Sequence, residues 1–340
     1  MPHHSTATVT RRHVLQALGA GALGAAQPPV QAAGAVTIRL SHVVAQQTPK
    51  GLALQRFKDL VEQRSDGAVR VAIYANSSLY GDTDEMQALQ MGAIDMLAPS
   101  LSKFGRIGFP EFEAYGLPFL FESAKQVRRV CDGPLGERML ASLGRQRMVG
   151  LGYLDNGFKH MSANRPLLTP ADYKGLRMRV QDSRVIAHQM RALGAQPVNL
   201  SFGETRRALA SGVVDGTENP VSNFWTQRMH EVQTDLTLTQ HGYLGYAVVA
   251  HRDFWASLPT AQRGLVHDAL REALAWGNTI AQQENDDALA ALRASRTTHI
   301  HQPDASQRER LRLAVGEVYD TLEKRIGSEW MRSLRAGLQA

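Results

Sequence analysis

Residues 174–220 place a strand, two helices and a second strand in succession, and this order restricts the fold more than any other feature. Apolar residues alternate with arginines over 176–180, which is the two-residue period of a half-buried strand. Helical spacing follows over 184–193, and Ser201 with Glu204 three residues later predicts a capping box for the next helix. Strands that alternate with helices predict an α/β fold with a largely parallel sheet.

The first part of the chain repeats this order. Alternation predicts strands over 36–43 and 93–97, and Asp82 with Glu85 predicts a capping box for a helix between them. Apolar residues keep helical spacing from 259 to about 294, which is ~50 Å of helix if the helix is continuous. These features predict two lobes with one long helix as a brace across both.

The middle and the end of the chain complete the predicted order of elements. A buried strand is expected over 149–154. The polar, glycine-containing residues 155–160 that follow are expected to form a turn where the chain crosses between the lobes. A last helix is expected over 304–338.

The N-terminus has the features of an export signal. Arg11 and Arg12 precede a short apolar run that ends at Ala26, and small residues lead to a predicted cleavage site near Val36. The run is too short and too rich in glycine for a membrane span. The adjacent arginines favour the twin-arginine route, and the general secretory route stays open. Residues 1–35 are therefore predicted to be a signal peptide of an exported, periplasmic protein.

Composition describes an ordinary globular protein and excludes several kinds of site. The net charge is +6, and removal of the leader takes two arginines with it. Nucleic acid is not an expected partner, because the basic residues are scattered and lack interleaved aromatic residues. The single cysteine, Cys131, rules out an internal disulfide and a cysteine metal cluster. The twelve histidines are dispersed, so we expect neither a metal nor another cofactor.

Arg179 is the first candidate for a binding residue. It lies at the end of the predicted strand 176–180, where a guanidinium could hold a carboxylate through two parallel hydrogen bonds. Asn219, after a turn signal at Asp215, offers an amide donor. One hypothesis is that Arg179 and Asn219 hold an organic anion. The other is that Arg179, like Arg177, faces solvent on an amphipathic strand.

Four more candidates follow the predicted strands of the first lobe. Ligands of parallel α/β sheets bind beyond the carboxyl ends of the strands. The residues that fall in or beside such positions are His42, Lys50, Ser100 and Lys103.

Sequence motifs of catalysis are missing. No Gly-x-Ser-x-Gly elbow, phosphate-binding loop or His-Glu-x-x-His occurs. An exported two-lobed protein without these motifs is predicted to be a binding protein and not an enzyme. A secreted enzyme that uses Asp215 and Glu218 as an acid/base pair is the alternative from another class.

Several blocks resemble one family, over about residues 36–330. The chain resembles the extracytoplasmic solute-binding subunits of tripartite ATP-independent periplasmic (TRAP) transporters, in the branch that binds C4-dicarboxylates. The blocks that carry the resemblance are SHVVAQQTPKG at 41–51, KGLRMRVQ at 174–181, LGAQPVNLSFGE at 193–204, SGVVDGTENPVSNFWTQ at 211–227 and HGYLGYAVV at 241–249.

The resemblance implies a two-lobed fold of the periplasmic-binding-protein type II kind, with the ligand crevice between the lobes and a long helix spanning both. Lobe I is expected to comprise residues 36–156 with a return over about 245–284. Lobe II is expected to comprise residues 157–244 with a return over about 285–340.

The resemblance also assigns site residues. Arg179 matches the arginine that forms the family's carboxylate salt bridge, and Asn219 matches its asparagine partner. Lys159 stands where many members have a second arginine, and Phe202 matches a position that packs on the bound acid. For the distal carboxylate of the ligand we expect Lys50 and Lys103, beside His42 and Ser100, from charge and loop position.

The function that the resemblance implies is capture of a C4-dicarboxylate of the succinate, malate and fumarate class by lobe closure. The ligand would then pass to the small and large membrane subunits of a TRAP transporter, and the binding protein is expected to be a monomer. A sugar acid or another monocarboxylate as the ligand stays open.

Overall fold

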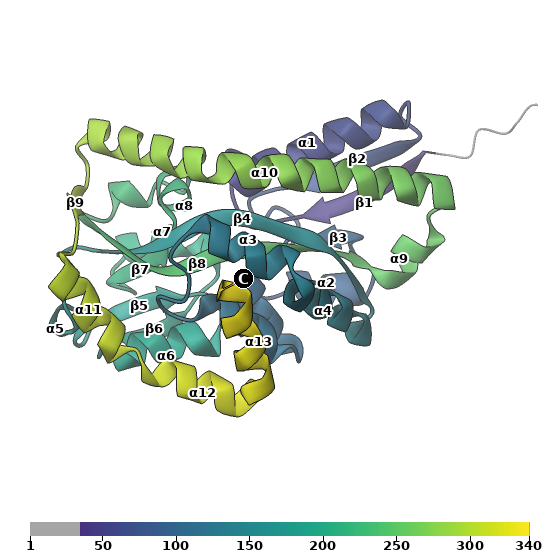
Figure 1. Cartoon of the computed structure of the whole chain (residues 1–340). Helices are drawn as coiled ribbons and strands as arrows, with labels where there is room; N and C mark the ends of the chain where they lie inside the picture. The colour runs from purple at the N-terminus through teal and green to yellow at the C-terminus, as the bar shows by residue number, and fades with distance from the viewer. Residues whose placement is uncertain (1–34, 340) are drawn as a thin grey trace, which may run out of the picture. The chain divides into compact units, whose positions relative to one another are not determined.

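One mixed sheet runs through residues 35–339, the part of the chain that the computed structural model describes (Figure 1). Eight strands follow the order β2-β1-β3-β8-β4-β7-β5-β6, and β9 pairs with β8 beside this path. The strands are β1 (Val36–Ser41), β2 (Val69–Tyr74), β3 (Met96–Leu97), β4 (Met148–Ala163), β5 (Arg177–Val180), β6 (Gln196–Asn199), β7 (Gly216–Asn219), β8 (Asp235–His251) and β9 (His299–His301). The predicted signal peptide lies, except for Ala35, outside the described residues.

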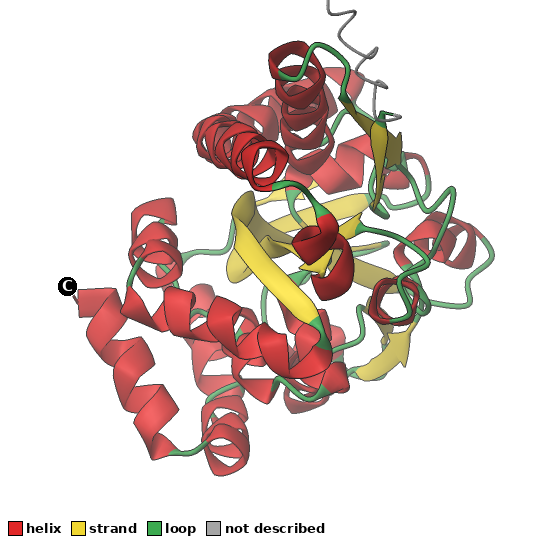
Figure 2. Ribbon diagram, turned by 90° about the vertical axis from the view of Figure 1, so that its right-hand side faces the viewer, coloured by secondary structure: helices red, strands yellow, loops and turns green. Residues whose placement is uncertain are grey.

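Helices lie on both sides of the sheet, as Figure 2 shows. The α-helices are α1 (Pro49–Arg64), α2 (Glu85–Gln90), α3 (Ala124–Asp132), α4 (Pro134–Ser142), α5 (Pro170–Tyr173), α6 (Arg184–Ala192), α7 (Phe202–Ala210), α8 (Val221–Thr226), α9 (Arg252–Ser257), α10 (Thr260–Ser295), α11 (Ala305–Ala314), α12 (Glu317–Ile326) and α13 (Ser328–Gln339). Four 3₁₀ helices complete the set: η1 (Leu101–Ile107), η2 (Pro110–Gly116), η3 (Leu143–Gln146) and η4 (Met229–Glu231). None of these helices is long and apolar enough to cross a membrane.

The sheet is parallel at its two ends and antiparallel in its middle. At one end β1 pairs in parallel with β2 and β3, and at the other β5 pairs in parallel with β6 and β7. The long strands β4 and β8 pair antiparallel between these groups. The predicted parallel groups are therefore present, and two strands from the middle of the chain join them into one sheet.

The turn expected at 155–160 is wrong, because β4 continues through these residues. The register with β8 shifts between Gly150 and Gly152, between Asp155 and Gly157, and between Lys159 and Met161. Such bulges let a strand bend without ending. Polar residues with a glycine look like a turn in the sequence, and here they form a bulged strand.

Helix α10 is continuous over 36 residues and lies along β4, α1 and α8 (Figure 1). Two of its asparagines bond to the bulged part of β4. Asn278 Oδ1 accepts a hydrogen bond from the Asp155 N–H at 2.8 Å, and Asn285 Nδ2 donates to the Asn156 carbonyl at 2.6 Å. The predicted long helix is confirmed, and these amides satisfy backbone groups that the irregular strand leaves unpaired.

Three other local predictions are wrong. Ser201 is the N-cap of α7, but its hydroxyl donates to the Glu204 carboxylate and makes no cap bond to the helix backbone, so the predicted capping box does not form. The last helix is divided into α11, α12 and α13, with an interruption at Gly327, whose φ of +88° favours glycine. Asp82 and Glu85 do not form a capping box, because Asp84 is the N-cap of α2 and both carboxylates bind Lys103 instead.

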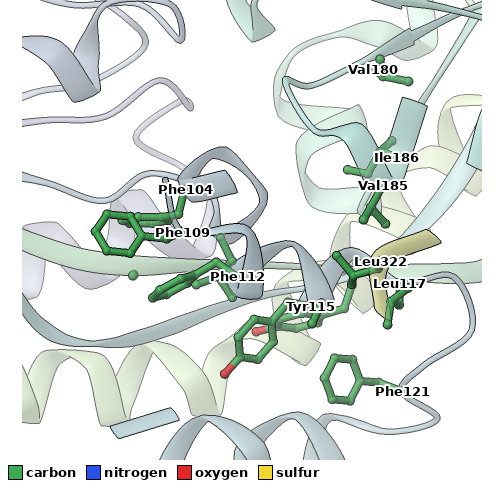
Figure 3. Packing of buried hydrophobic residues seen from close by; sticks show 14 of the residues in the cluster. Phe104, Phe109, Phe112, Tyr115, Leu117, Phe121, Val180, Val185, Ile186 and Leu322 are labelled. Atoms are coloured by element: carbon green, nitrogen blue, oxygen red, sulfur yellow. The ribbon is translucent and has the colours of Figure 1, made fainter. Parts of the chain in front are cut away.

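The largest core cluster of the described residues packs η1 and η2 against α6 and α12. Phe104 and Phe112 stack with ring centroids 4.7 Å apart, and Phe109 packs edge-on against Phe112. Figure 3 shows the rings of Phe104 in η1, Phe112 in η2 and Phe109 between them. Val185 and Ile186 of α6 and Leu322 of α12 belong to the same cluster. Burial of each such side chain contributes about 1.5–3 kcal/mol. The cluster supports η1, which carries Lys103. The predicted lobe boundaries stay a prediction.

Candidate functional site

A cavity lies between the two parallel ends of the sheet. It is lined by Val43, Val44, Asp82, Ser100, Lys103, Lys159, Arg179, Gln181, Phe202, Glu218, Asn219, Asn223, Leu244 and Tyr246. Six of the eight predicted site residues are among them: Arg179, Asn219, Lys159, Phe202, Ser100 and Lys103. His42 and Lys50 do not line it.

Arg179 is a buried cation whose terminal nitrogens have no carboxylate partner among the described residues. Its side chain is almost fully buried, and its Nε donates to the Leu200 carbonyl at 2.9 Å. Its guanidinium carbon lies 5.6 Å from the centroid of the Phe202 ring. Burial lowers the pKa of Arg179, and Asp82 and Glu218 oppose this effect. An arginine remains charged under these conditions, so an unpaired positive charge stands at the cavity wall.

The neighbouring Arg177 behaves differently, and this contradicts the hypothesis that both arginines face solvent. Arg177 is exposed and forms an ion pair of 2.7 Å with Asp215. Arg179, two residues further along the same strand, is 3% exposed and lines the cavity beside Phe202. Only Arg177 therefore faces solvent.

Asn219 ends β7, the strand next to β5. Thr217 is paired with Arg179 across the two strands, and Asn219, two residues later, lies on the same side of the sheet. The Asn219 Nδ2 lies 3.3 Å from Thr217 Oγ1 and 3.6 Å from Met229 Sδ. Register therefore places the amide at the cavity beside the guanidinium.

Lys159 and Glu218 form a buried ion pair behind this amide. Lys159 Nζ lies 2.7 Å from Glu218 Oε1, and His241 Nε2 lies 2.9 Å from Glu218 Oε2. Burial would raise the pKa of Glu218, but Lys159 and the hydrogen bond from His241 lower it to about 2. Thr239 Oγ1 contacts His241 Nδ1 at 2.7 Å. The charge of Lys159 is thus already compensated.

The two acids that a secreted enzyme would use as an acid/base pair, Asp215 and Glu218, have different partners. Asp215 is partly exposed and bonds to Arg177, whereas Glu218 is buried against Lys159. Asp215 does not line the cavity. The two acids therefore do not form a pair in one site.

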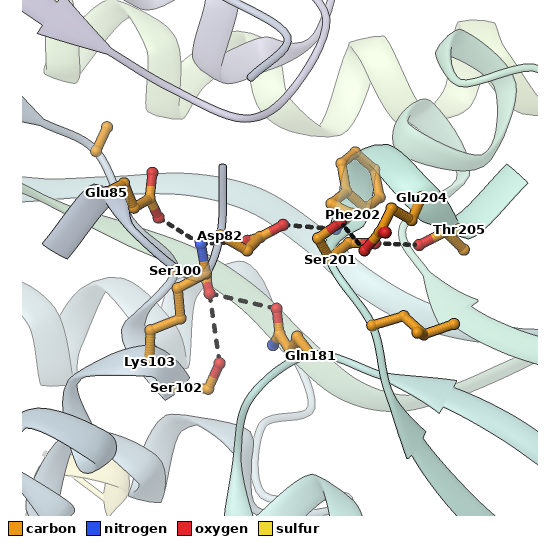
Figure 4. A network of polar contacts seen from close by, with 12 residues as sticks. Asp82, Glu85, Ser100, Ser102, Lys103, Gln181, Ser201, Phe202, Glu204 and Thr205 are labelled. Carbon is orange, nitrogen blue, oxygen red and sulfur yellow. Dashed lines mark hydrogen bonds and ion pairs between the residues drawn. The ribbon is translucent and has the colours of Figure 1, made fainter. Parts of the chain in front are cut away.

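Lys103 lies on the opposite wall and has two carboxylate partners, Asp82 and Glu85 (Figure 4). Burial would raise the pKa of Asp82, but Lys103 and Arg179 lower it to about 2. Ser100 Oγ donates to Gln181 Oε1 at 3.2 Å. Lys103, like Lys159, is therefore a compensated cation.

Lys50 and His42 lie behind the cavity wall. Lys50 Nζ donates to the Ala98 carbonyl at 2.8 Å and lies 3.8 Å from the centroid of the Tyr246 ring. Burial lowers the pKa of Lys50 to about 7 and that of His42 to about 3. Tyr246 itself lines the cavity, so Lys50 supports a wall residue and does not reach the space.

Four polar cavity residues were missed by the sequence analysis: Asp82, Gln181, Asn223 and Tyr246. Gln181 directly follows β5, so the rule on strand ends that selected Ser100 could have found it. Asn223 lies four residues after Asn219. Asp82 has no comparable signal, because its spacing to Glu85 is equally that of a capping box.

Residues 40–325 match the sequence profile of the bacterial extracellular solute-binding proteins, family 7 (DctP). The chain belongs to this family. The predicted resemblance and the two-lobed fold are thereby confirmed. Among residues 35–339, no three His, Cys, Asp or Glu side chains gather as a metal site would need.

The family 7 relatives match over nearly their full length. The chain is 44% identical over 328 residues to the C4-dicarboxylate-binding periplasmic protein DctP of Rhodobacter capsulatus, which covers 96% of this chain and 98% of that protein. A TRAP periplasmic solute-binding protein of Shewanella oneidensis, solved with bound succinate, superposes with a TM-score of 0.87 at 38% identity, over 90% of this chain and 100% of that one. A TRAP protein of Pseudomonas aeruginosa with bound L-malate gives 0.82 at 36% identity, over 84% and 99%.

Proposed function

We propose that this protein is a periplasmic solute-binding protein that captures a C4-dicarboxylate between its lobes and delivers it to a TRAP-type membrane transporter. The observation that carries the proposal is Arg179, a buried guanidinium at a cavity with no carboxylate partner among residues 35–339. Relatives of similar sequence are named for C4-dicarboxylates or hold succinate or L-malate.

Charge compensation supports Arg179 as the group that binds the first carboxylate. Lys103 and Lys159 each have a carboxylate of the protein within ion-pair distance. Arg179 does not, and a buried charge without a partner is costly. A ligand carboxylate supplies that partner through two parallel hydrogen bonds. Asn219, on the adjacent strand, is placed to donate to the same group.

The second carboxylate of the ligand meets other polar donors of the cavity. Ser100, Gln181 and Asn223 line it, and the ammonium groups of Lys103 and Lys159 keep further hydrogen-bond donors. His42 and Lys50 are not among these donors because they lie behind the wall. Phe202 packs against the carbon chain of the ligand.

Transport follows from closure. The cavity residues come from both ends of the sheet, so a ligand that contacts both holds them together only by its extra affinity for the closed form. Lobe I (36–156 and about 245–284) and lobe II (157–244 and about 285–340) are the moving parts. Export by the signal at 1–35 places the protein beside its membrane subunits in the periplasm.

Calorimetry on protein refolded without ligand tests the proposal. Succinate, L-malate and fumarate are expected to bind to the wild type, and butyrate, which lacks the second carboxylate, is expected to bind at least about tenfold more weakly. Arg179→Ala should abolish binding, whereas Arg177→Ala, two residues away on the same strand, should bind as the wild type does. Normal binding by Arg179→Ala contradicts the assignment of the anchor. Tighter binding of D-galactonate than of the three dicarboxylates contradicts the ligand class, and conversion of the bound acid on prolonged incubation contradicts the binding role.

A further inference from the structure

Asp82 connects the two ends of the sheet across the cavity. It lies in the loop after β2, the first strand of the sheet path, and Phe202 begins α7, which follows β6, the last strand of that path. One carboxylate oxygen of Asp82 accepts a hydrogen bond from the Phe202 N–H, and the other pairs with Lys103 (Figure 4). Lys103, Asp82 and the Phe202 amide are here called the Asp82 bridge.

The Asp82 bridge is a contact between distant parts of the fold. Asp82 and Phe202 are 120 residues apart in the sequence. The two groups that Asp82 binds are each held by other contacts. Lys103 is also paired with the buried Glu85, and Phe202 is buried in a hydrophobic cluster that includes residues of α7 and α8. The bond between Asp82 and Phe202 therefore requires that the part of the fold that holds Lys103 and the part that holds Phe202 lie close together.

Other polar contacts join the same two parts of the fold, among them an exposed ion pair of 3.2 Å between Arg106 and Asp182. Two more are weaker in kind. Ser100 Oγ lies 3.2 Å from Gln181 Oε1, and Gln227 Nε2 lies 3.4 Å from Asn76 Oδ1. These are bonds between neutral groups. A hydrogen bond to a carboxylate is about twice as strong as a bond between neutral groups, and Asp82 is shielded from solvent because its side chain is only 11% exposed.

We propose that Asp82 is a positioning residue that stabilises the closed form of the cavity independently of the ligand. This inference rests on the proposed function, because it assumes that ligand capture is coupled to closure. The carboxylate holds the Lys103 wall and the Phe202 wall at a fixed separation. Phe202 in turn lies beside the guanidinium of Arg179, so the bridge also sets the position of the anchor's apolar neighbour.

A bond that exists only in the closed form acts on every ligand alike. The apparent dissociation constant equals the intrinsic one divided by the fraction of protein in the binding-competent form. Loss of the Asp82 bridge lowers that fraction, so the apparent affinity decreases by the same factor for every acid. A direct contact between Asp82 and the ligand would give a factor that differs between succinate, which has no hydroxyl group, and L-malate, which has one.

Asp82→Ala is the first test, and Asp84→Ala is its control because Asp84 is exposed and makes no side-chain cap bond. We expect Asp82→Ala to bind succinate, L-malate and fumarate about tenfold more weakly, by the same factor within about twofold, and mainly through faster dissociation. Small-angle scattering of the ligand-free variant should give a larger radius of gyration than the wild type. Asp84→Ala should match the wild type in both measurements.

A second pair of variants removes the bond from the other side, in case Asp82→Ala does not fold. Phe202→Ala and Phe202→Pro both lose the ring, but only the proline loses the N–H that donates to Asp82. Proline fits the first position of a helix, and the preceding Ser201 has φ −59° and ψ 154°, which a following proline permits. We expect Phe202→Pro to be more open without ligand than Phe202→Ala and to bind the three acids more weakly.

The outcomes separate this inference from the proposed function. If the wild type binds none of the three acids, the proposed function fails, and the radius of gyration still reports on the bridge. If the wild type binds them and Asp82→Ala has an unchanged radius, or Phe202→Pro equals Phe202→Ala, the bridge does not stabilise closure. The inference is also overturned if Asp82→Ala weakens the binding of succinate and of L-malate by strongly different factors.

Discussion

The ammonium of Lys159 lies 2.7 Å from Glu218 Oε1, and each side chain is only 2% exposed. The pair joins β4 to its neighbour β7 next to Asn219. Two charges removed from water in this way stabilise the fold only while both are present.

Lys159→Met should destabilise the protein by about 3–5 kcal/mol, because it leaves the buried Glu218 carboxylate without its cation. Urea unfolding followed by circular dichroism measures the change. Arg177→Met is the control: its pair with Asp215 is exposed, so its removal should change stability far less. Equal effects of the two variants would show that burial of the Lys159 pair has no consequence for stability.

His42 should cause the free energy of unfolding to decrease as the pH falls, and this decrease should begin at a higher pH than the one at which carboxylates become protonated. Its pKa is lowered from 6.5 in the unfolded chain to about 3 by burial and by Lys50. Between these values the unfolded chain binds a proton that the folded chain does not, so the free energy of unfolding decreases as the pH falls from 6.5 towards 3.

At pH 5, His42 should lower the free energy of unfolding by about 2 kcal/mol relative to neutral pH. The variant His42→Phe should not show this decrease. His160, whose pKa is also lowered to about 3, keeps its own contribution in that variant. Urea unfolding at pH 7.5 and pH 5 measures the difference. His267→Ala, an exposed position on α10, should retain the full slope, and an unchanged slope in His42→Phe would contradict the prediction.

Asn285→Ala should weaken the attachment of α10 to the bulged strand. The side chain accepts from the Ser222 N–H at 3.0 Å and donates to the Asn156 carbonyl at 2.6 Å. Loss of both bonds leaves two backbone groups unpaired, and we expect a cost of about 1–3 kcal/mol in thermal or urea unfolding. Gln282→Ala removes a side-chain bond to Asp286 on the exposed face of the same helix and should change stability by about 0.5 kcal/mol or less.

Citrate should bind at least about tenfold more weakly than succinate in competition calorimetry. Arg179 is the cavity cation without a carboxylate partner among the described residues, since Lys103 and Lys159 are already paired. The third carboxylate of citrate therefore has no unpaired cation to bind in the cavity. It is repelled by the like charges of Asp82 and Glu218. Citrate affinity equal to that of succinate would contradict this account of the charges.

The sequence predicted those parts of the fold and site that depend on local pattern. The alternation at 176–180 is the strand that carries Arg179, and apolar spacing over 259–294 is the single helix α10. The turn signal at Asp215 pointed to Asn219, and the family motifs added Lys159 and Phe202; all three line the cavity.

Other parts depend on tertiary packing that no local pattern expresses. Residues 155–160 are mostly polar with a glycine, and they belong to a strand that pairs with β8. Asn278 and Asn285, more than 120 residues later, bond to the backbone of this strand. Lys50 and Lys103 both follow strands and carry the same charge. Lys50 turns to the Ala98 carbonyl and the Tyr246 ring, whereas Lys103 reaches the cavity.

The order of strands has a consequence for how the polypeptide acquires its structure. Strand β3 pairs with β8, so the first three strands meet their neighbour in the sheet only after residue 250 is available. The second parallel group reaches the first only through the same β4 and β8 pair. Pairings this distant in sequence slow folding. A chain that ends before β8 contains every strand of both parallel groups and still lacks the strand that joins them, and we expect such a fragment to remain unfolded.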